Sequence, residues 1–205
     1  MRRYAWILSL LLLGAPFRGW ATMAMPLDAE QLVKRADVVV VGVVQSAQPG
    51  ERKSALLNGP LAVTAYSILV RDVVKGNLKV GELFQFEQVG SAQATGPGYR
   101  PAGVPGYVVG QEYLLFLRKL SNGLFALVGL DQGRCRILQT EQGKAVECGF
   151  QNRFLFGGSD GARPPLTVKG ATKAEQTAMQ QTGGPVPYGD LLSILRKMAP
   201  PTDQK

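Results

Sequence analysis

The residues that usually carry out catalysis are scarce in this 205-residue chain, which contains no histidine. That absence removes the commonest metal ligand and the usual general base near neutral pH. Segment 157–161 (GGSDG) matches the G-x-S-x-G turn that carries the nucleophile of many hydrolases. Such a turn needs a buried strand before it, a helix after it and a His base, whereas Pro164 and Pro165 follow it here. The match therefore predicts an ordinary loop.

Carboxylates are the remaining catalytic candidates. Glu87 and Glu112 border a long central loop, and together with Asp131 they are the residues that a glycosidase-type hydrolase could use. Such an enzyme needs two carboxylates roughly 5–10 Å apart across a cleft. A solvated strand face is the simpler interpretation of these acids. No acidic spacing resembles a calcium loop and no glycine-rich segment leads into Lys-Ser/Thr, so neither a metal nor another cofactor is predicted.

The central loop, residues 90–110, is rich in Gly and Pro and has no periodic pattern. A loop of this length in a compact domain is usually functional or disordered. Tyr99, Arg100 and Tyr107 are the predicted binding residues, since aromatic rings and an Arg on a loop rim could stack against a peptide or a glycan. The alternative is a loop that packs its own rings.

The two cysteines flank a predicted hairpin. A register that puts Glu141 and Gln142 at the tip places Cys135 directly opposite Cys148, within reach of a disulfide. An oxidising compartment favours the bond, and two free thiols are the alternative. There is no Cys-x-x-Cys, so a redox role is not predicted.

Residues 1–24 have the three-part layout of a secretory signal peptide. Arg2 and Arg3 precede a short apolar run at 5–15, and small residues follow, with cleavage expected after Ala24 or alternatively after Ala21. The run is too short to span a bilayer, so no stable membrane anchor is expected after cleavage, and the protein is expected to be periplasmic or secreted.

Charge argues against nucleic acid as a partner. The formal charge of +8 falls to +5 once Arg2, Arg3 and Arg18 leave with the signal peptide. The remaining basic residues are dispersed in ones and twos, without the basic stripe typical of nucleic-acid binders.

Apolar patterning predicts a mainly β fold, a small antiparallel OB-like barrel with a short N-terminal helix and a C-terminal amphipathic helix. Asp28 should cap the first helix. The expected domain plan is a barrel at 25–156, a flexible linker at 157–186, and a helix with its tail at 187–205. The expected elements are a helix at 27–37, strands at 38–44, 61–74, 82–89, 112–120 and 124–130, a hairpin of 134–140 with 144–150, a loop at 48–60, and a helix at 188–198.

Several short segments resemble the netrin-like modules, which include the tissue inhibitors of metalloproteinases, and similar segments are associated with uncharacterised exported bacterial proteins. The resemblance covers about residues 30–140 and lies in Ala36-Asp37-Val38, Tyr66, Ile68, Lys75-Gly76 and Glu112-Tyr113-Leu114. It implies an OB-type barrel. The inhibitors of that family chelate the protease zinc through an N-terminal Cys, whereas the first Cys here is Cys135, so the resemblance does not imply inhibition of that kind.

These observations lead to one main hypothesis: an exported, non-enzymatic binding module, expected to be an accessory of an envelope or secretion system. Its partner would be a protein or an envelope glycan. The alternatives are a carboxylate-dependent hydrolase and a protease-inhibitor-like protein without the zinc-chelating Cys.

Overall fold

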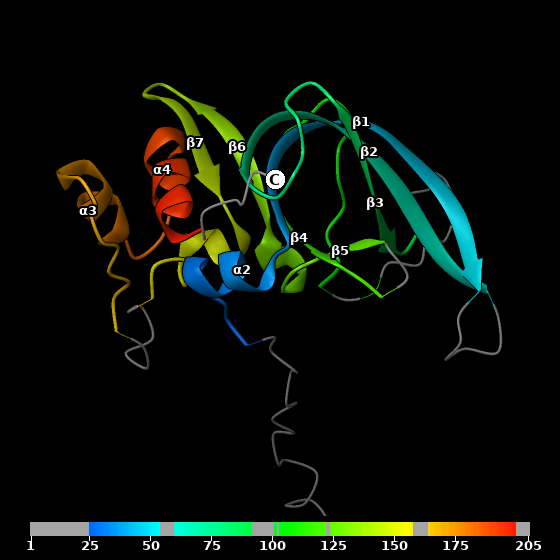
Figure 1. Cartoon of the computed structure of the whole chain (residues 1–205), viewed down its shortest axis with the longest axis horizontal. Helices are drawn as coiled ribbons and strands as arrows, with labels where there is room; N and C mark the ends of the chain where they lie inside the picture. Colours follow the sequence, from blue (N-terminus) through cyan, green and yellow to red (C-terminus); the bar gives the residue numbers. More distant parts are fainter. Residues whose placement is uncertain are drawn as a thin grey trace, which may run out of the picture.

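The computed structural model describes residues 25–53, 60–91, 101, 103–121, 124–157 and 164–199 (Figure 1). The predicted signal peptide therefore lies outside the described residues. The elements are, in order, α2 (Ala29–Arg35), β1 (Val38–Lys53), β2 (Pro60–Lys75), β3 (Leu83–Val89), β4 (Glu112–Lys119), β5 (Phe125–Leu127), the 3₁₀ helix η1 (Leu130–Gly133), β6 (Arg134–Thr140), β7 (Gly143–Glu147), the 3₁₀ helix η2 (Gly149–Asn152), α3 (Lys173–Met179), β8 (Val186–Pro187) and α4 (Tyr188–Met198).

The strands form one antiparallel sheet, which confirms the predicted mainly β fold. Its order is β3-β2-β1-β4-β6-β7-β8, and β5 pairs with the end of β4 beside β6. The sheet does not close on itself, so it matches the expected barrel only loosely. Strands β1 to β5 form the curled part of the sheet, while β6 to β8 extend it under the helices (Figure 1).

Strands β1 and β4 form a wall between two hydrophobic cores. On β1, Val39 and Val41 face the helices whereas Val38 and Val40 face the inside of the curl. Strand β4 alternates in the same way, with Leu114 and Phe116 on one side and Tyr113, Leu115 and Leu117 on the other. Side chains alternate between the two faces of a strand, so a continuous apolar run is what a wall of this kind requires. The prediction that 38–44 is buried on both faces is confirmed.

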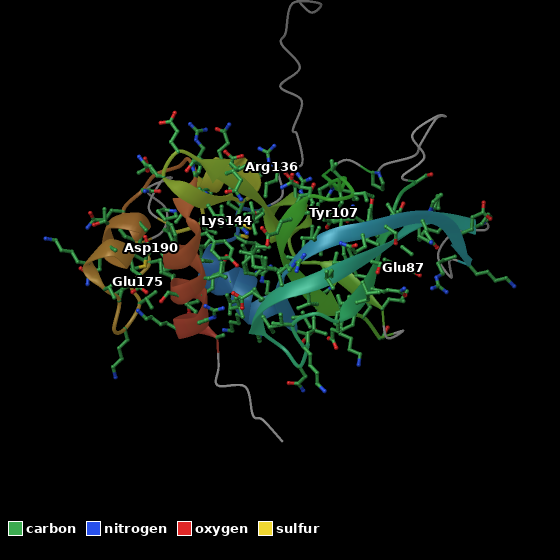
Figure 2. All side chains as sticks on the ribbon, turned by 90° about the horizontal axis from the view of Figure 1, so that it is seen from above. Glu87, Tyr107, Arg136, Lys144, Glu175 and Asp190 are labelled. Carbon is green, nitrogen blue, oxygen red and sulfur yellow. A yellow bond between two sulfur atoms is a disulfide. The ribbon has the colours of Figure 1, made fainter. Side chains whose placement is uncertain are left out.

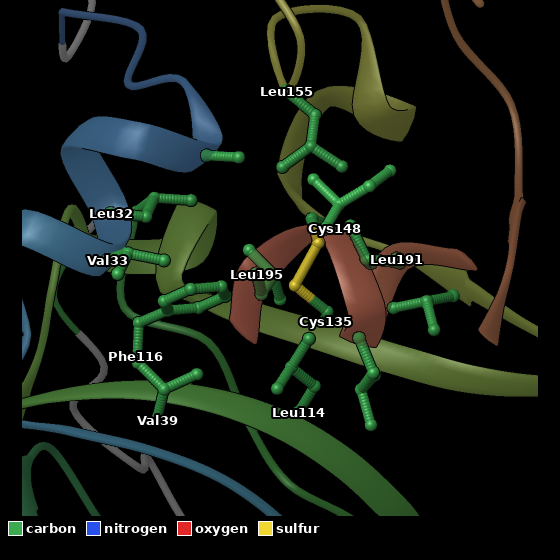
Figure 3. Packing of buried hydrophobic residues seen from close by; sticks show 14 of the residues in the cluster. Leu32, Val33, Val39, Leu114, Phe116, Cys135, Cys148, Leu155, Leu191 and Leu195 are labelled. Atoms are coloured by element: carbon green, nitrogen blue, oxygen red, sulfur yellow. A yellow bond between two sulfur atoms is a disulfide. The ribbon is translucent and has the colours of Figure 1, made fainter. Parts of the chain in front are cut away.

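The helix-side core lies between the sheet and helices α2 and α4 (Figure 3). Asp28 caps α2 in a capping box with Gln31, as its position predicted. At the other end of α2, Nζ of Lys75 donates to the carbonyls of Val33, at 2.9 Å, and Ala36, at 2.5 Å. A cation at a helix C-terminus satisfies carbonyls that lack helical partners and opposes the helix dipole.

The predicted cysteine register is confirmed. Across the β6–β7 hairpin Arg136 pairs with Glu147 and Thr140 with Gly143, which leaves residues 141 and 142 at the tip. Continuing that register places Cys135 opposite Cys148, and the two form a disulfide with Cα atoms 3.8 Å apart. Figure 3 shows this bond beside α4, between the labelled residues Leu191 and Leu195.

The β1–β2 hairpin is longer than the sequence predicts. Residues 48–53 and Pro60 were predicted to be part of a loop, and they instead extend the two strands. Beyond Val43 the partner of β1 within the described residues is β2, because the pairing with β4 ends there. Pro49 lacks a backbone N–H but is tolerated on such an edge, where one side of the strand needs no ladder bond.

The predicted strand at 124–130 is also corrected. Only β5 forms, and the chain then turns through Gly129 and Leu130, both with positive φ, into η1. A Cβ atom on Gly133 would lie 2.2 Å from the carbonyl oxygen of Val128, so this tight turn admits only glycine at that position. Backbone approach in the turn overrides the apolar pattern of the sequence.

The described part of the predicted linker 157–186 contains structure. Helix α3 forms there with a capping box between Thr172 and Glu175, and Ala178 and Met179 are buried against the helix-side core. Helix α4 has the bounds that the amphipathic pattern predicted, and its Lys197 binds the two carboxylate oxygens of Glu175 at 2.7 and 2.5 Å. A capped helix with an ion pair to α4 therefore lies within the segment that the composition predicts to be a flexible linker.

The Glu175–Lys197 contact makes stability depend on pH. Hydrogen bonds from Lys197, then from Ser193 and the backbone of Thr172, lower the pKa of Glu175 from 4.5 to about 2. A lowered carboxylate pKa stabilises the folded state above pH 4.5, and this contribution disappears as the pH falls toward 2. Glu175→Gln should therefore lower the urea midpoint at pH 7, and its difference from the unaltered protein should shrink between pH 4.5 and pH 2.

Midpoints measured at several pH values across that range test this expectation. Glu141→Gln, at the exposed tip of the β6–β7 hairpin, is the control for the loss of one surface carboxylate. A difference between Glu175→Gln and the unaltered protein that stays constant below pH 4.5 would assign the effect to packing rather than to charge.

Candidate functional site

The sheet is open at a seam between β3 and β5. The two strands lie side by side without a ladder, and the ring centroids of Phe84 and Phe125 are 5.0 Å apart across the seam. Near the end of β3 there is a groove of about 290 Å³, called here the seam groove. Its lining residues are Arg52, Lys53, Leu61, Val63, Glu87, Gln88, Val89, Val104, Pro105, Leu120, Leu124, Ala126, Leu127 and Leu130.

The lining of the seam groove is aliphatic apart from a polar end formed by β1 and β3. At that end the guanidinium of Arg52 forms a two-point contact with the carboxylate of Glu87. The hydrogen bond from Arg52 outweighs partial burial and holds the pKa of Glu87 below its usual value. Lys53 is exposed beside them. The groove therefore combines an apolar floor with one charged edge.

Leu130 is the most unusual residue of the groove. Its φ is 57°, in the left-handed region that costs a residue with a Cβ atom about 1–2 kcal/mol, and its side chain remains 43% exposed. Strained residues persist where the surrounding structure holds them in place, and such residues cluster at binding and catalytic sites. A strained backbone that holds an exposed leucine at the edge of an apolar groove is typical of a binding surface.

Of the three predicted binding residues, only Tyr107 lies among the described residues; Tyr99 and Arg100 lie outside them. The ring of Tyr107 packs in the core inside the curl, with centroids 4.6 Å from Tyr66 and 5.3 Å from Tyr113. Its hydroxyl is buried without a hydrogen-bond partner among the described residues, and burial raises its pKa. Figure 2 shows Tyr107 beside the ribbon of β1.

The described part of the central loop is fixed to the sheet. Arg134 donates through Nη1 to the carbonyl of Gly106 at 2.5 Å, and Gln88 donates through Nε2 to the carbonyl of Pro105 at 2.5 Å. The hydroxyl of Tyr113 accepts a hydrogen bond from the backbone N–H of Val108 at 3.1 Å. These contacts hold Val104 and Pro105 against the groove, so this loop does contribute to a surface hollow, through residues other than those predicted.

The three candidate carboxylates lie in separate ion pairs. Glu87 pairs with Arg52 at the seam groove, and Glu112 binds Lys144 at 2.7 Å. Asp131 binds Arg134 at 2.8 Å. Each acid therefore has a cation of its own.

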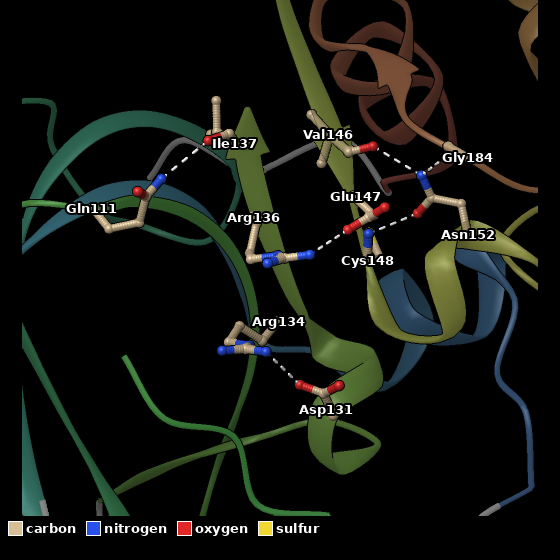
Figure 4. Close-up of polar contacts among 10 residues, drawn as sticks. All are labelled: Gln111, Asp131, Arg134, Arg136, Ile137, Val146, Glu147, Cys148, Asn152 and Gly184. Atoms are coloured by element: carbon tan, nitrogen blue, oxygen red, sulfur yellow. Dashed lines mark hydrogen bonds and ion pairs between the residues drawn. The ribbon is translucent and has the colours of Figure 1, made fainter. Parts of the chain in front are cut away.

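A second hollow, of about 170 Å³, lies beside the disulfide. Its charges are balanced in two pairs, Asp131 with Arg134 and Glu147 with Arg136 (Figure 4). Within the described ranges no three His, Cys, Asp or Glu side chains are grouped closely enough to hold a metal ion.

No protein-family model matches the sequence, and no curated protein is significantly similar to it. In the part of the chain that the structure describes, none of the helices is both long and apolar enough to cross a membrane.

Sequence reasoning missed the aliphatic residues of the seam groove. Leu61, Val63, Val89 and Leu127 belong to predicted strands, where an apolar residue is ordinarily assigned to a core. Their shared surface depends on β3 meeting β5 without pairing, and this is a property of the whole sheet. The one local signal was Gly129-Leu130, where glycine directly precedes a leucine at the end of an apolar run.

Proposed function

We propose that this chain is an exported, non-enzymatic binding module whose ligand enters the seam groove. The observation that carries the proposal is Leu130, which is held 43% exposed at an aliphatic hollow on a left-handed backbone. An exposed apolar hollow with a few polar groups at one edge is the usual form of a binding site.

The N-terminal pattern and the disulfide support export to the periplasm or the exterior, where thiols are oxidised. The spatial order β3-β2-β1-β4-β5, open between its ends, supports an OB-type, netrin-like module as the scaffold. In this arrangement the groove lies between the β1–β2 end and the β4–β5 connection. A role as an accessory of an envelope or secretion system follows as part of the same proposal.

The lining favours a protein partner over an envelope glycan. Sugars are usually held by aromatic stacking and many polar contacts, whereas the described lining residues include no aromatic ring. The hydrolase alternative has less support, because Glu87, Glu112 and Asp131 are each neutralised by a different cation.

Leu130→Asn tests the groove without disturbing the fold. Asparagine accepts a left-handed backbone more readily, which offsets the loss of a half-buried leucine, so the melting temperature should change by only a few degrees. The loss of about half a leucine side chain from the site, roughly 1 kcal/mol, should weaken binding of the neutral apolar dye Nile red about fivefold. Fluorescence titration at fixed protein concentration gives the dissociation constants.

Phe150→Asn is a matched control. Phe150 also has a φ of 57° and is 44% exposed, but it lines the charge-balanced hollow beside the disulfide instead of the seam groove. Its replacement should leave Nile red binding within twofold of the unaltered protein. Equal losses in both variants, or no dye binding by the unaltered protein, would count against the proposed site.

A further inference from the structure

Among the described residues strand β3 pairs only with β2, and the ladder shows which of its backbone groups face the other edge. The N–H of Gly90 donates to the carbonyl of Ala62 at 2.8 Å, and the N–H of Val70 donates to the carbonyl of Glu82 at 3.0 Å. Hydrogen-bonded pairs alternate along an antiparallel ladder. The register therefore directs the backbone N–H and C=O groups of every second residue of β3 away from β2: Leu83, Gln85, Glu87 and Val89.

Strand β5 faces the same seam with its own unpaired backbone groups. The N–H of Leu120 donates to the carbonyl of Leu124 at 2.7 Å, and that of Val128 to the carbonyl of Phe116 at 2.9 Å. The same alternation turns the backbone groups of Phe125 and Leu127 away from β4. Polar backbone groups from two strands thus border the seam beside an aliphatic groove.

This combination restricts the chemistry of the ligand. A purely hydrocarbon ligand would cover backbone donors and acceptors without replacing their hydrogen bonds to water, which is unfavourable. An extended peptide supplies both what the backbone edges require and apolar side chains for the groove.

The charges around the groove favour an acidic partner. Arg52 and Lys53 lie at its polar end, where Glu87 neutralises one positive charge. Arg118 is exposed directly opposite Ala126, a groove residue, and residues opposite each other in a ladder share one face of the sheet. Cations therefore flank the groove from β1 and from β4.

Resting on the proposed function, we infer that the seam groove binds an extended segment of a partner protein that adds as a strand to the end of β3 at Glu87 to Val89, beyond the contact of Phe84 with Phe125. The segment places alternate aliphatic side chains in the groove, and acidic residues at its ends meet the flanking cations. This mode of recognition derives affinity from main-chain hydrogen bonds and selectivity from the alternate side chains.

A fluorescein-labelled, amidated heptapeptide, Glu-Val-Thr-Leu-Thr-Val-Glu, is the probe, and fluorescence polarisation is the readout. Two analogues carry N-methyl groups at every second residue, one at the odd-numbered positions and the other at the even-numbered positions. The methyl groups remove backbone donors and keep every side chain. At least one of them should bind tenfold or more weakly than the parent peptide. A version with Lys in place of both Glu residues should bind at least threefold more weakly at low salt.

Val89→Pro tests the same edge from the protein side. Val89 opposes Val63 in a pair that exchanges no hydrogen bonds, so proline removes an N–H that faces the seam and leaves the β2–β3 ladder complete. Peptide affinity should fall about tenfold. Leu83→Pro, at an equivalent position beyond the groove, is the matched control and should stay within twofold.

The outcomes separate this inference from the proposed function. If both N-methylated analogues bind as well as the parent peptide, or if no peptide binds while Nile red still does, strand addition is wrong and the apolar groove stands. Failure of Nile red itself refutes the proposed function. Should Val89→Pro not fold by circular dichroism, the peptide series on the unaltered protein still decides.

Discussion

Replacing Tyr107 by alanine is expected to lower the free energy of unfolding by about 3 kcal/mol, the cost of removing a large ring from a packed core. The ring contacts Tyr66, Phe86 and Tyr113 at centroid distances of 4.6, 5.4 and 5.3 Å. No neighbouring side chain could fill the space without leaving its own partners. Urea unfolding followed by circular dichroism measures the loss.

Tyr107→Phe is the informative companion of that variant. The hydroxyl of Tyr107 has no hydrogen-bond partner among the described residues, so its removal relieves an unfavourable burial while the ring contacts persist. The phenylalanine variant should be as stable as the unaltered protein or up to about 1 kcal/mol more stable. It should also bind Nile red normally, since Tyr107 does not line the seam groove.

A stable Tyr107→Ala variant with weakened ligand binding would reverse this interpretation. It would return the residue to the binding role that the sequence suggested. The expected result instead assigns Tyr107 to the aromatic core. Replacing all three predicted residues, Tyr99, Arg100 and Tyr107, by alanine is therefore a poor test of binding, since loss of the Tyr107 ring would alter the fold itself.

The sequence predicted those elements whose determinants are local. Asp28 marks the start of α2, and the leucines of 188–198 fall on one stripe of α4. The hairpin register with residues 141 and 142 at its tip placed Cys135 opposite Cys148. The double-sided burial of 38–44 follows from a run of six valines that only Gly42 interrupts. In each case the deciding interaction lies within the segment or across one tight turn.

The errors arose where distant segments determine the structure. Pro49 and Gly50 suggested a loop, but an edge position next to β2 lets them extend β1. The composition of 157–186 gave no indication of a helix, but α3 forms there and its Glu175 binds Lys197 on α4. Neither partner could be identified from the segment alone.

The candidate site depended even more on tertiary structure. Strands β6 and β5 share the edge of β4 that faces away from β1. Residues 113–115 of β4 pair with β6, and residues 117–119 pair with β5. Strand β5 is a three-residue branch that pairs with β4 and not with β3. The central loop was the predicted binding region, and its described residues reach the groove only through Val104 and Pro105.

Removal of the Cys135–Cys148 disulfide is the second large effect to expect. The bond closes a loop with a sequence separation of 13, and for a loop of this length cross-linking reduces the entropy of the unfolded chain by an amount worth about 3 kcal/mol. Cys135→Ala with Cys148→Ala should lower the free energy of unfolding by that amount, as measured in urea. The single variants are less informative, because each leaves a free thiol.

Dithiothreitol provides the control for this comparison. It should bring the unaltered protein down to the stability of the double variant and should leave the double variant unchanged. A midpoint of the unaltered protein that does not respond to the reductant would contradict the structural role of the bond.

Both sulfur atoms lie in the helix-side core, whereas the seam groove lies on the curled part of the sheet beyond the wall formed by β1 and β4. The folded double variant should therefore bind Nile red and the heptapeptide as well as the unaltered protein, because the disulfide stabilises one core and the ligand is bound beside the other.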